Sequence, residues 1–255
     1  MATLVDLSAP ITNGPDGVDP VFQTQIDFAG HERGAQDIER MFGVPPDLLR
    51  DHEGWAVETF LRFGTHNSTH VDAPWHYNSS IGGAKAQTID ELPLDWFFRP
   101  GVVLDMTHKD DGDAVTVSDL ERGLAAVGHD LQPMDIVLIR TDRDLAYGEP
   151  DYIVRGPGVS PEATQSLYER GVRVMGIDAW GWDAPLPLQA ADALARRRPG
   201  IFWAAHQVGL AYSQIERLFN LRALPATGFT IACFPLRIVG ASGAPARVVA
   251  IVDDD

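Results

Sequence analysis

The chain has one cysteine, few basic residues and no long apolar run, and each shortage excludes a class of protein. A single cysteine, Cys233, excludes an internal disulfide and a thiolate-rich zinc site. It lies in an apolar stretch, so we expect a buried core thiol. Lysine and arginine number 20 against 36 aspartates and glutamates, which gives a net charge of −16. Such a surface repels phosphate backbones and argues against a nucleic-acid partner.

Signals for membranes and for several common enzyme classes are also missing. No apolar run approaches the roughly 18 residues of a membrane span. Residues 1–8 lack the basic and apolar segments of a signal peptide, which favours a cytoplasmic location and no membrane partner. The sequence contains no Gly-x-Ser-x-Gly elbow and no Walker loop. A serine hydrolase of the common α/β kind and a P-loop nucleotide enzyme are therefore not expected.

What is present is the composition of an ordinary globular protein, 45% hydrophobic over 255 residues, enough for a substantial core. Apolar runs and helix signals alternate along the chain, which predicts an α/β fold with a mixed central β-structure. We find no linker and no repeat, so a single domain over 1–255 is expected. The expected strands are 4–7, 101–106, 135–140, 172–178, 229–233 and 247–252, and the expected helices are 117–124 with Ser118 as N-cap, 160–170 with Ser160 as N-cap, and 214–221.

The region before residue 60 is harder to interpret. Residues 11–35 are rich in glycine, proline and aspartate and predict an extended loop, residues 36–50 predict short helical turns, and 56–72 is strand-like. Its apolar residues are numerous for a loop, which favours a homo-oligomer, a dimer or a tetramer. The alternative is that the region folds back on its own core. The apolar residues concerned are Phe22, Phe28, Met41, Phe42 and Trp55.

One segment carries the chemistry. Residues 66–76 read His-Asn-Ser-Thr-His-Val-Asp-Ala-Pro-Trp-His and hold three of the eight histidines. On an extended chain His66, His70 and Asp72 point the same way, whereas on a helix Asp72 lies about 200° from His70. Pro74 forbids a continuing helix and turns the chain, so that His76 can approach from the side. Histidine with carboxylate is a ligand set for Zn²⁺, Mn²⁺ or Fe²⁺, and the segment predicts such a site.

This segment resembles the His-x-Gly-Thr-His-x-Asp-x-Pro-x-His motif of the cyclase-like metal hydrolases, a family that includes kynurenine formamidase, isatin hydrolase and trans-dienelactone hydrolase. Ser68 stands where the family has glycine, and we expect serine to fit an extended chain there. Four further segments resemble the family in order along nearly the whole chain. They are Val5–Ser8, Gly176–Asp178, His206 with Ile215–Leu221, and Phe234–Gly240 with Ser242–Arg247.

The resemblance implies a swivelling β/β/α fold and a metal centre. His66, His70 and Asp72 would bind a divalent ion, Mn²⁺ or Zn²⁺, and His206 and Glu216 would complete the site or hold a second ion. Gln214 is a weaker ligand candidate. His76 follows the ligand segment and would carry a proton, since histidine titrates near pH 6.5, with Glu216 as the alternative carrier.

The expected function is hydrolysis of a small cyclic amide or lactone by metal-activated water. Aromatic side chains at Phe63, Trp75, Trp180 and Trp182 could line a flat pocket, which ranks an isatin-like lactam first, a dienelactone second and N-formylkynurenine third. Two alternatives stay open: an inactive protein that binds a metal or a small molecule, and a cyclase or dehydratase that uses the same metal. Asp183, close to this aromatic stretch, is expected to be a cap or a solvated residue.

Overall fold

The computed structural model describes residues 2–14 and 19–253. The chain forms two compact units, one of residues 1–10 and 68–255 and the other of residues 11–67. The prediction of one domain over 1–255 stays a prediction. Within the described ranges, no helix is long and apolar enough to cross a membrane.

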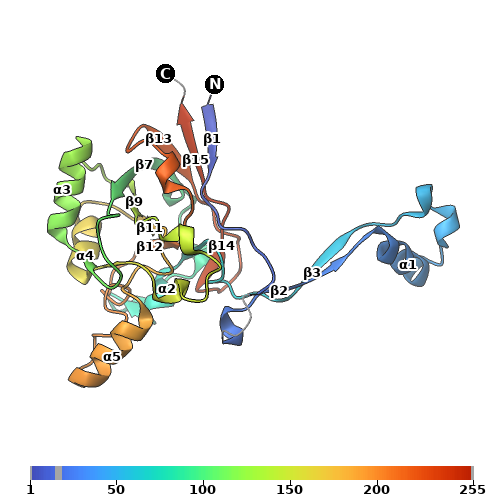
Figure 1. Cartoon of the computed structure of the whole chain (residues 1–255), viewed down its shortest axis with the longest axis horizontal. Coiled ribbons are helices and arrows are strands. Elements are labelled where there is room, and N and C mark those ends of the chain that lie inside the picture. Colours follow the sequence, from blue (N-terminus) through green and yellow to red (C-terminus); the bar gives the residue numbers. More distant parts are fainter. Residues whose placement is uncertain (1, 15–18, 254–255) are drawn as a thin grey trace. The chain divides into compact units, whose positions relative to one another are not determined.

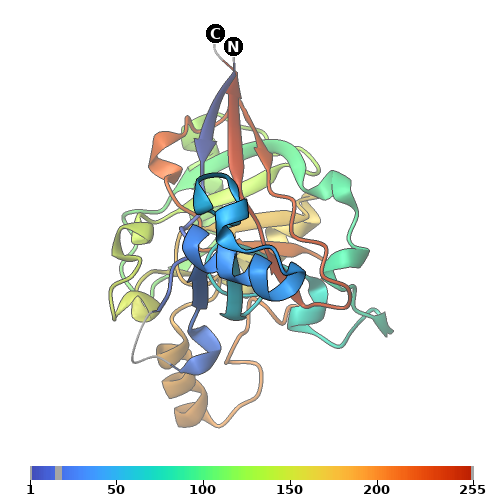
Figure 2. The same cartoon turned by 90° about the vertical axis from the view of Figure 1, so that its right-hand side faces the viewer.

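The larger unit is built on one nine-stranded mixed sheet (Figure 1). Strands β7, β9, β11 and β12 run parallel at its centre, and antiparallel strands extend it on both sides. Figure 2 shows β1 beside β15 close to both chain ends, as their antiparallel register requires. The predicted α/β class with mixed β-structure is confirmed. In spatial order the strands are β1 (Ala2–Asp6), β15 (Val249–Asp253), β13 (Phe229–Ala232), β7 (Phe98–Asp105), β9 (Ile136–Arg140), β11 (Val174–Ile177), β12 (Ser213–Glu216), β4 (His70–Asp72) and β14 (Gly243–Pro245).

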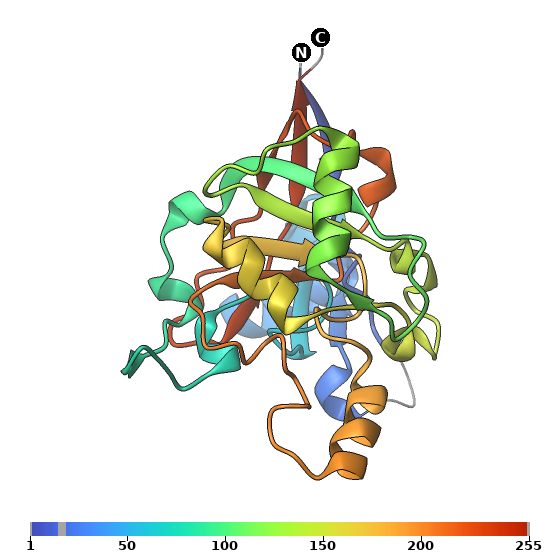
Figure 3. The same cartoon turned by 90° about the vertical axis from the view of Figure 1, so that its left-hand side faces the viewer.

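Helices α3 (Val117–Val127) and α4 (Pro161–Glu169) lie side by side over one face of the parallel strands (Figure 3). Ser160 caps α4 as predicted, because its side chain accepts a hydrogen bond from the Ala163 N–H. The cap predicted at Ser118 is wrong. Thr116 caps α3 instead, in a reciprocal pair with Asp119, since that spacing satisfies two N-terminal N–H groups at once.

Two apolar clusters cover the two faces of the sheet. Val137 and Ile139 of β9 pack under the helices, whereas Leu138 between them belongs to the opposite cluster. Strands buried on both faces appear in the sequence as continuous apolar runs, which is why the central strands were predictable. The second cluster contains Ala250 of β15 and Ala244 of β14, near opposite edges of the sheet, so the sheet curls around it. Cys233 lies there, fully buried as predicted.

The smaller unit differs from its prediction. Residues 15–18 of the predicted loop 11–35 lie outside the described residues. The rest is not one extended loop, because β2 (Gln25–Ala29) pairs antiparallel with β3 (Val57–Arg62) and α1 (His31–Phe42) follows directly. The short turns predicted for 36–50 are partly this single helix, which ends at Gly43 in the left-handed conformation. The partner of β2 lies about thirty residues away in sequence, and local turn residues do not reveal such a pairing.

The helix predicted at 214–221 is wrong, and this segment carries the ligand candidates Gln214 and Glu216. Residues Ser213–Glu216 form strand β12, parallel to β11 and antiparallel to β4. Pairing on both sides outweighs the weak helical preference of the segment. The remaining elements are α2 (Pro74–Tyr77), α5 (Leu186–Arg196), the strand pairs β5 (Ser80–Ile81) with β6 (Ala84–Lys85) and β8 (Ala114–Val115) with β10 (Gly158–Val159), and the 3-10 turns η1 (Pro20–Phe22), η2 (Pro46–Leu48), η3 (Arg50–His52), η4 (Ile89–Glu91), η5 (Leu94–Trp96), η6 (Arg143–Ala146), η7 (Tyr152–Val154) and η8 (Leu221–Ala223).

Candidate metal centre

The pairing of β4 with β12 gathers polar side chains on one face of the sheet. His70 lies opposite Glu216 and Asp72 opposite Gln214, so all four project to the same side. Val71 and Ile215, which alternate with them, are fully buried in the apolar cluster on the other side. The register thus anchors the two strands in the core while it presents two carboxylates, an imidazole and an amide together.

Their ligand atoms are close enough to share an ion. His70 Nε2 lies 3.2 Å from Asp72 Oδ1 and 3.6 Å from Glu216 Oε2, and the ligand atoms of these residues lie within 4.8 Å of one another. All three residues are buried. His70 Nδ1 lies 2.9 Å from the Ser68 carbonyl oxygen, which can only accept, so the ring proton is on Nδ1. Nε2 then directs its lone pair toward the carboxylates, as a metal ligand must.

The strand that carries His70 is shorter than expected. Ser68 has a φ of 58°, in the left-handed region, so the chain turns between His66 and His70 instead of continuing extended. The expectation that serine fits an extended chain here is wrong. Because glycine adopts this conformation without steric cost, the turn explains why the motif that this segment resembles has glycine at this position. The Ser68 hydroxyl donates to the Ala9 carbonyl at 3.2 Å, which offsets part of the strain.

His206 reaches the same place from the loop after α5. Its Nε2 lies 3.4 Å from Glu216 Oε1 and 3.9 Å from Asp72 Oδ2. Asp183 holds the other side of the residue, with its Oδ2 2.5 Å from Nδ1 and 3.0 Å from the backbone nitrogen. Asp183 is therefore neither a cap nor a solvated group. A carboxylate on Nδ1 fixes the ring so that Nε2 faces the centre.

The charges here depend on one another. Burial by itself lowers the pKa of His206, but Asp183 and Glu216 outweigh it and raise the pKa to about 10. Burial raises the pKa of Glu216, yet the neighbouring His206 ring brings it below the usual value. Without a metal, the folded site therefore keeps a protonated His206 between the side chains of Asp183 and Glu216, and a divalent cation can substitute for that proton.

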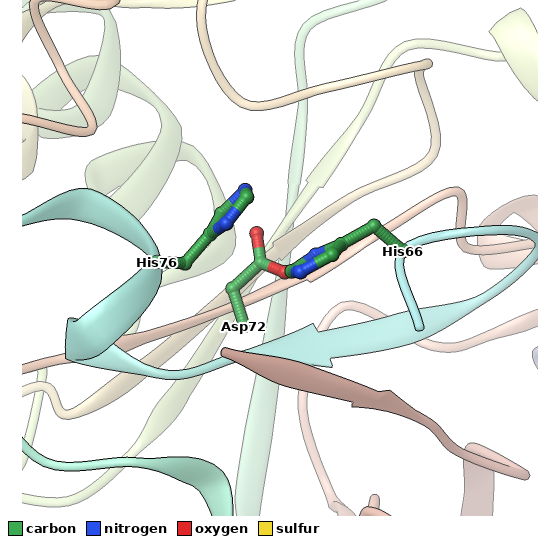
Figure 4. Close-up of side chains that lie close together, drawn as sticks. All are labelled: His66, Asp72 and His76. Carbon is green, nitrogen blue, oxygen red and sulfur yellow. The ribbon is translucent and has the colours of Figure 1, made fainter. Parts of the chain in front are cut away.

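His66, Asp72 and His76 form a second grouping around the same aspartate. Their ligand atoms lie within 4.8 Å of one another. Figure 4 shows Asp72 projecting from β4, with the ring of His66 on one side and that of His76 on the other. His66 comes from the turn before β4 and His76 from the short helix α2, which starts at Pro74. The structure thus brings together every residue predicted for the centre, and Asp72 is common to both groupings.

The donor set fits a divalent ion. It combines imidazoles with buried carboxylates, the ligands that Zn²⁺ and Mn²⁺ accept in proteins. Gln214 adds an independent observation, because its side-chain Oε1 is buried and has no hydrogen-bond partner among the described residues. An orphaned carbonyl oxygen two residues from Glu216 is costly unless a ligand or an ion satisfies it.

The four predicted pocket residues have different environments. Trp75 is 37% exposed, and Lys85 lies over its ring. Trp180 is half-buried and carries the Arg217 guanidinium on its ring. Trp182 is a core residue, since it is fully buried and its Nε1 donates to Thr164 Oγ1 at 2.9 Å. Its backbone N–H nevertheless donates to Glu216 Oε1 at 2.8 Å. Phe63 belongs to the unit of residues 11–67, where its ring contacts Phe60.

Other aromatic residues also surround the centre. Trp203 stacks on His206, with ring centroids 4.5 Å apart, and meets His76 edge-on at 4.9 Å. Tyr77 and Tyr212 are buried, stack on one another at 5.1 Å, and form a wall beside His206. A signal existed for Tyr77, which directly follows His76. The sequence also favours Trp203, which with Phe202, Trp180 and Trp182 is expected to be half core packing and half pocket wall. Tyr212 gave no signal, because only the fold places it here.

Comparison with known proteins gives a consistent result. Residues 5–184 match the family described as "Putative cyclase". The chain is 30% identical over 191 residues to kynurenine formamidase of Salinibacter ruber, covering 74% of this chain and 77% of that protein. It is 29% identical over 250 residues to isatin hydrolase of Roseibium aggregatum, covering 91% and 87%. Among solved structures, isatin hydrolase A from Labrenzia aggregata, bound to benzyl benzoate, superposes with a TM-score of 0.71 at 26% identity, covering 99% of this chain and 94% of that one.

Proposed function

Because the chain belongs to this cyclase family, we propose that it is a metal-dependent hydrolase that opens a small cyclic amide or lactone. One observation carries the proposal: His70 and Asp72 of β4, Glu216 of β12 and His206 of the loop after α5 converge in a buried site from three separate parts of the chain. Similarity to a kynurenine formamidase and an isatin hydrolase supports the reaction class, since both names describe hydrolysis at a carbonyl group.

The residues have distinct tasks in this proposal. His66, His70, Asp72, His206 and Glu216 would hold one or two ions, Mn²⁺ or Zn²⁺, and Asp72 belongs to both groupings of ligand atoms. When bound, the ion supplies Lewis-acid activation of water and of the substrate carbonyl. Asp183 keeps His206 oriented, and the Trp182 N–H keeps Glu216 in place. His76 is half-buried beside Trp203, where it can pass a proton to the leaving nitrogen or oxygen.

The aromatic surroundings favour a flat substrate. Trp203 and Trp180 are half-buried, and Trp75 is partly exposed, so their rings can contact a planar ligand. We therefore rank an isatin-like lactam first, a conjugated lactone of the dienelactone kind second and an N-formyl amine third. The alternative of an inactive binding protein is less well supported, because both candidate proton carriers, His76 and Glu216, lie in the grouped site.

A substrate panel tests the proposal. The purified protein is treated with a chelator, reloaded with Mn²⁺ or Zn²⁺, and assayed on isatin, a dienelactone, N-formylkynurenine and an aliphatic lactone of similar size. We expect hydrolysis only after reloading, with the planar conjugated substrates ahead. Metal binding without turnover of any substrate would instead identify a binding protein. Equal rates on the aliphatic and aromatic compounds would contradict the aromatic pocket.

We also propose that the protein is a homodimer at least. Phe28, Met41, Phe42 and Trp55 are exposed apolar side chains of residues 11–67, and a second copy covering them would remove apolar surface from water. Light scattering should give at least twice the 27.8 kDa of one chain. Replacing Phe28 and Phe42 with serine should shift the mass toward one chain, whereas Leu194→Ser, at an apolar residue on α5 that is even more exposed, should not. A wild-type monomer at micromolar concentration would refute the dimer.

A further inference from the structure

A buried arginine directly follows the metal-ligand candidate Glu216. Arg217 is 6% exposed, and its guanidinium carbon lies 3.8 Å from the centre of the Trp180 ring. Its Nε donates to the Trp180 carbonyl oxygen at 3.2 Å. Its φ of 57° is in the left-handed region, which costs a side-chain-bearing residue about 1 kcal/mol. A strained backbone at a buried cation indicates that this position has a task other than packing.

Among the described residues, Arg217 is not neutralised by an ion pair. Within residues 2–14 and 19–253, no aspartate or glutamate forms an ion pair with it. Arg222, five residues later, instead pairs with both Asp142 and Asp144. At 6% exposure this cation is almost entirely removed from water, which is costly. Buried charges in proteins are normally paired, so an anionic partner is expected from outside the chain.

An unsatisfied donor lies against the same indole. Tyr152 is 3% exposed, and its ring packs edge-on to Trp180 with centroids 5.8 Å apart. Its hydroxyl is buried and has no hydrogen-bond partner among the described residues. Burial raises the pKa of this phenol well above 10, so the hydroxyl keeps its proton and can donate. A guanidinium without an ion-pair partner and a phenol without an acceptor, both among the described residues, therefore flank one flat ring.

The loop Trp180-Gly-Trp182 connects this place to the metal centre. The Trp182 N–H donates to Glu216 Oε1 at 2.8 Å, while the Trp180 carbonyl accepts from Arg217. A Cβ atom added at Gly181, between them, would lie 3.3 Å from the same glutamate oxygen, so the loop runs directly along the centre. A ligand held at Arg217 would thus lie beside the ions that the centre is proposed to hold.

We propose that Arg217 and Tyr152 bind a carboxylate group of the substrate, next to Trp180, so that the enzyme selects planar conjugated substrates carrying a negative charge outside the bond that is hydrolysed. The inference rests on the proposed hydrolase site and narrows its substrate class to members that carry a carboxylate, so isatin itself, which has none, should be a poorer substrate than a carboxylated lactam of the same shape. A carboxylate offers two acceptors, which suits the forked guanidinium and the single phenol donor. The indole supplies a flat surface for the ring that carries the carboxylate.

Binding of benzoate and benzamide, which share a ring and a size, tests the proposal by calorimetry on the metal-loaded protein. In Arg217→Gln we expect benzoate to bind about 10- to 100-fold more weakly, since a charge-assisted hydrogen bond is lost. Benzamide affinity should change less than about twofold. Any contribution from the metal to benzoate binding is the same in both proteins and cancels in the comparison. Arg217→Lys should recover part of the loss, and Tyr152→Phe should weaken benzoate alone by a few-fold.

Arg173 provides the matched control. Its guanidinium lies 4.1 Å from the Tyr168 ring, at the opposite end of strand β11 from Trp180, so Arg173→Gln removes a stacked arginine without affecting benzoate. Metal content and thermal melting verify that each variant is folded and loaded. Unchanged benzoate affinity in Arg217→Gln, equal losses for both compounds, or no benzoate binding to the wild type would overturn the proposal. If the wild type binds benzoate through Arg217 as expected but hydrolyses no cyclic substrate, the carboxylate site stands and only the proposed hydrolase function is wrong.

Discussion

Replacing His70 with alanine is expected to remove the metal from the protein and abolish hydrolysis. The ring lies within 3.6 Å of both Asp72 and Glu216, so its loss leaves two buried carboxylates without a neighbouring imidazole on that side. Lewis-acid activation is worth several kcal/mol of transition-state stabilisation, so kcat should fall on the order of 10⁴-fold. Elemental analysis after dialysis, together with the rate on the best substrate of the panel, measures both effects.

His129 is the control for this substitution. It forms a histidine–aspartate contact of the same kind, with Nε2 2.8 Å from Asp135 Oδ2, but it lies in the loop after α3. His129→Ala should keep its metal and its rate. If His70→Ala retained full metal occupancy, the assignment of β4 as the ligand strand would be wrong, whatever happened to the rate.

Replacing His76 with alanine should separate metal binding from catalysis. We expect the variant to keep its metal and to lose about 10²- to 10⁴-fold in kcat, the usual cost of removing a general acid–base. The ring is placed for proton transfer, beside Trp203 and 6.0 Å from the His206 ring, and it comes from α2 after the ligand strand has ended. His66→Ala, from the turn before β4, should lose both metal and rate.

Two results would contradict the prediction for His76. His76 shares with His66 and Asp72 a grouping that could itself hold an ion, so loss of metal in His76→Ala would make this histidine a ligand. Near-normal kcat with the metal in place would mean that another group carries the proton, and Glu216 is the best placed candidate. Exchange of His76 for glutamine, which keeps a polar side chain of similar size, verifies that any loss comes from proton transfer.

Local patterns predicted much of the larger unit. Strands such as β9 and β11 are buried on both faces, so their sequences are continuous apolar runs that can be recognised without a partner. The helix α4 begins at Ser160 and Pro161, a cap and first-turn pair that acts within a few residues. The predictions failed where pairing is distant, as for β2 with β3, or where a strand lies between two partners, as for β12.

By itself the sequence determined the chemistry of the centre, because His66, His70, Asp72 and His76 lie within one short segment and carry the donor types that a divalent ion requires. Only the tertiary structure decided how they are arranged. The turn at Ser68, the opposition of His70 to Glu216 and the support of His206 by Asp183 all depend on register and on contacts between distant residues. The same holds for Arg217 and Tyr152, since whether a cation lacks an ion-pair partner, or a hydroxyl lacks an acceptor, is a property of the packed molecule, where burial sets its cost.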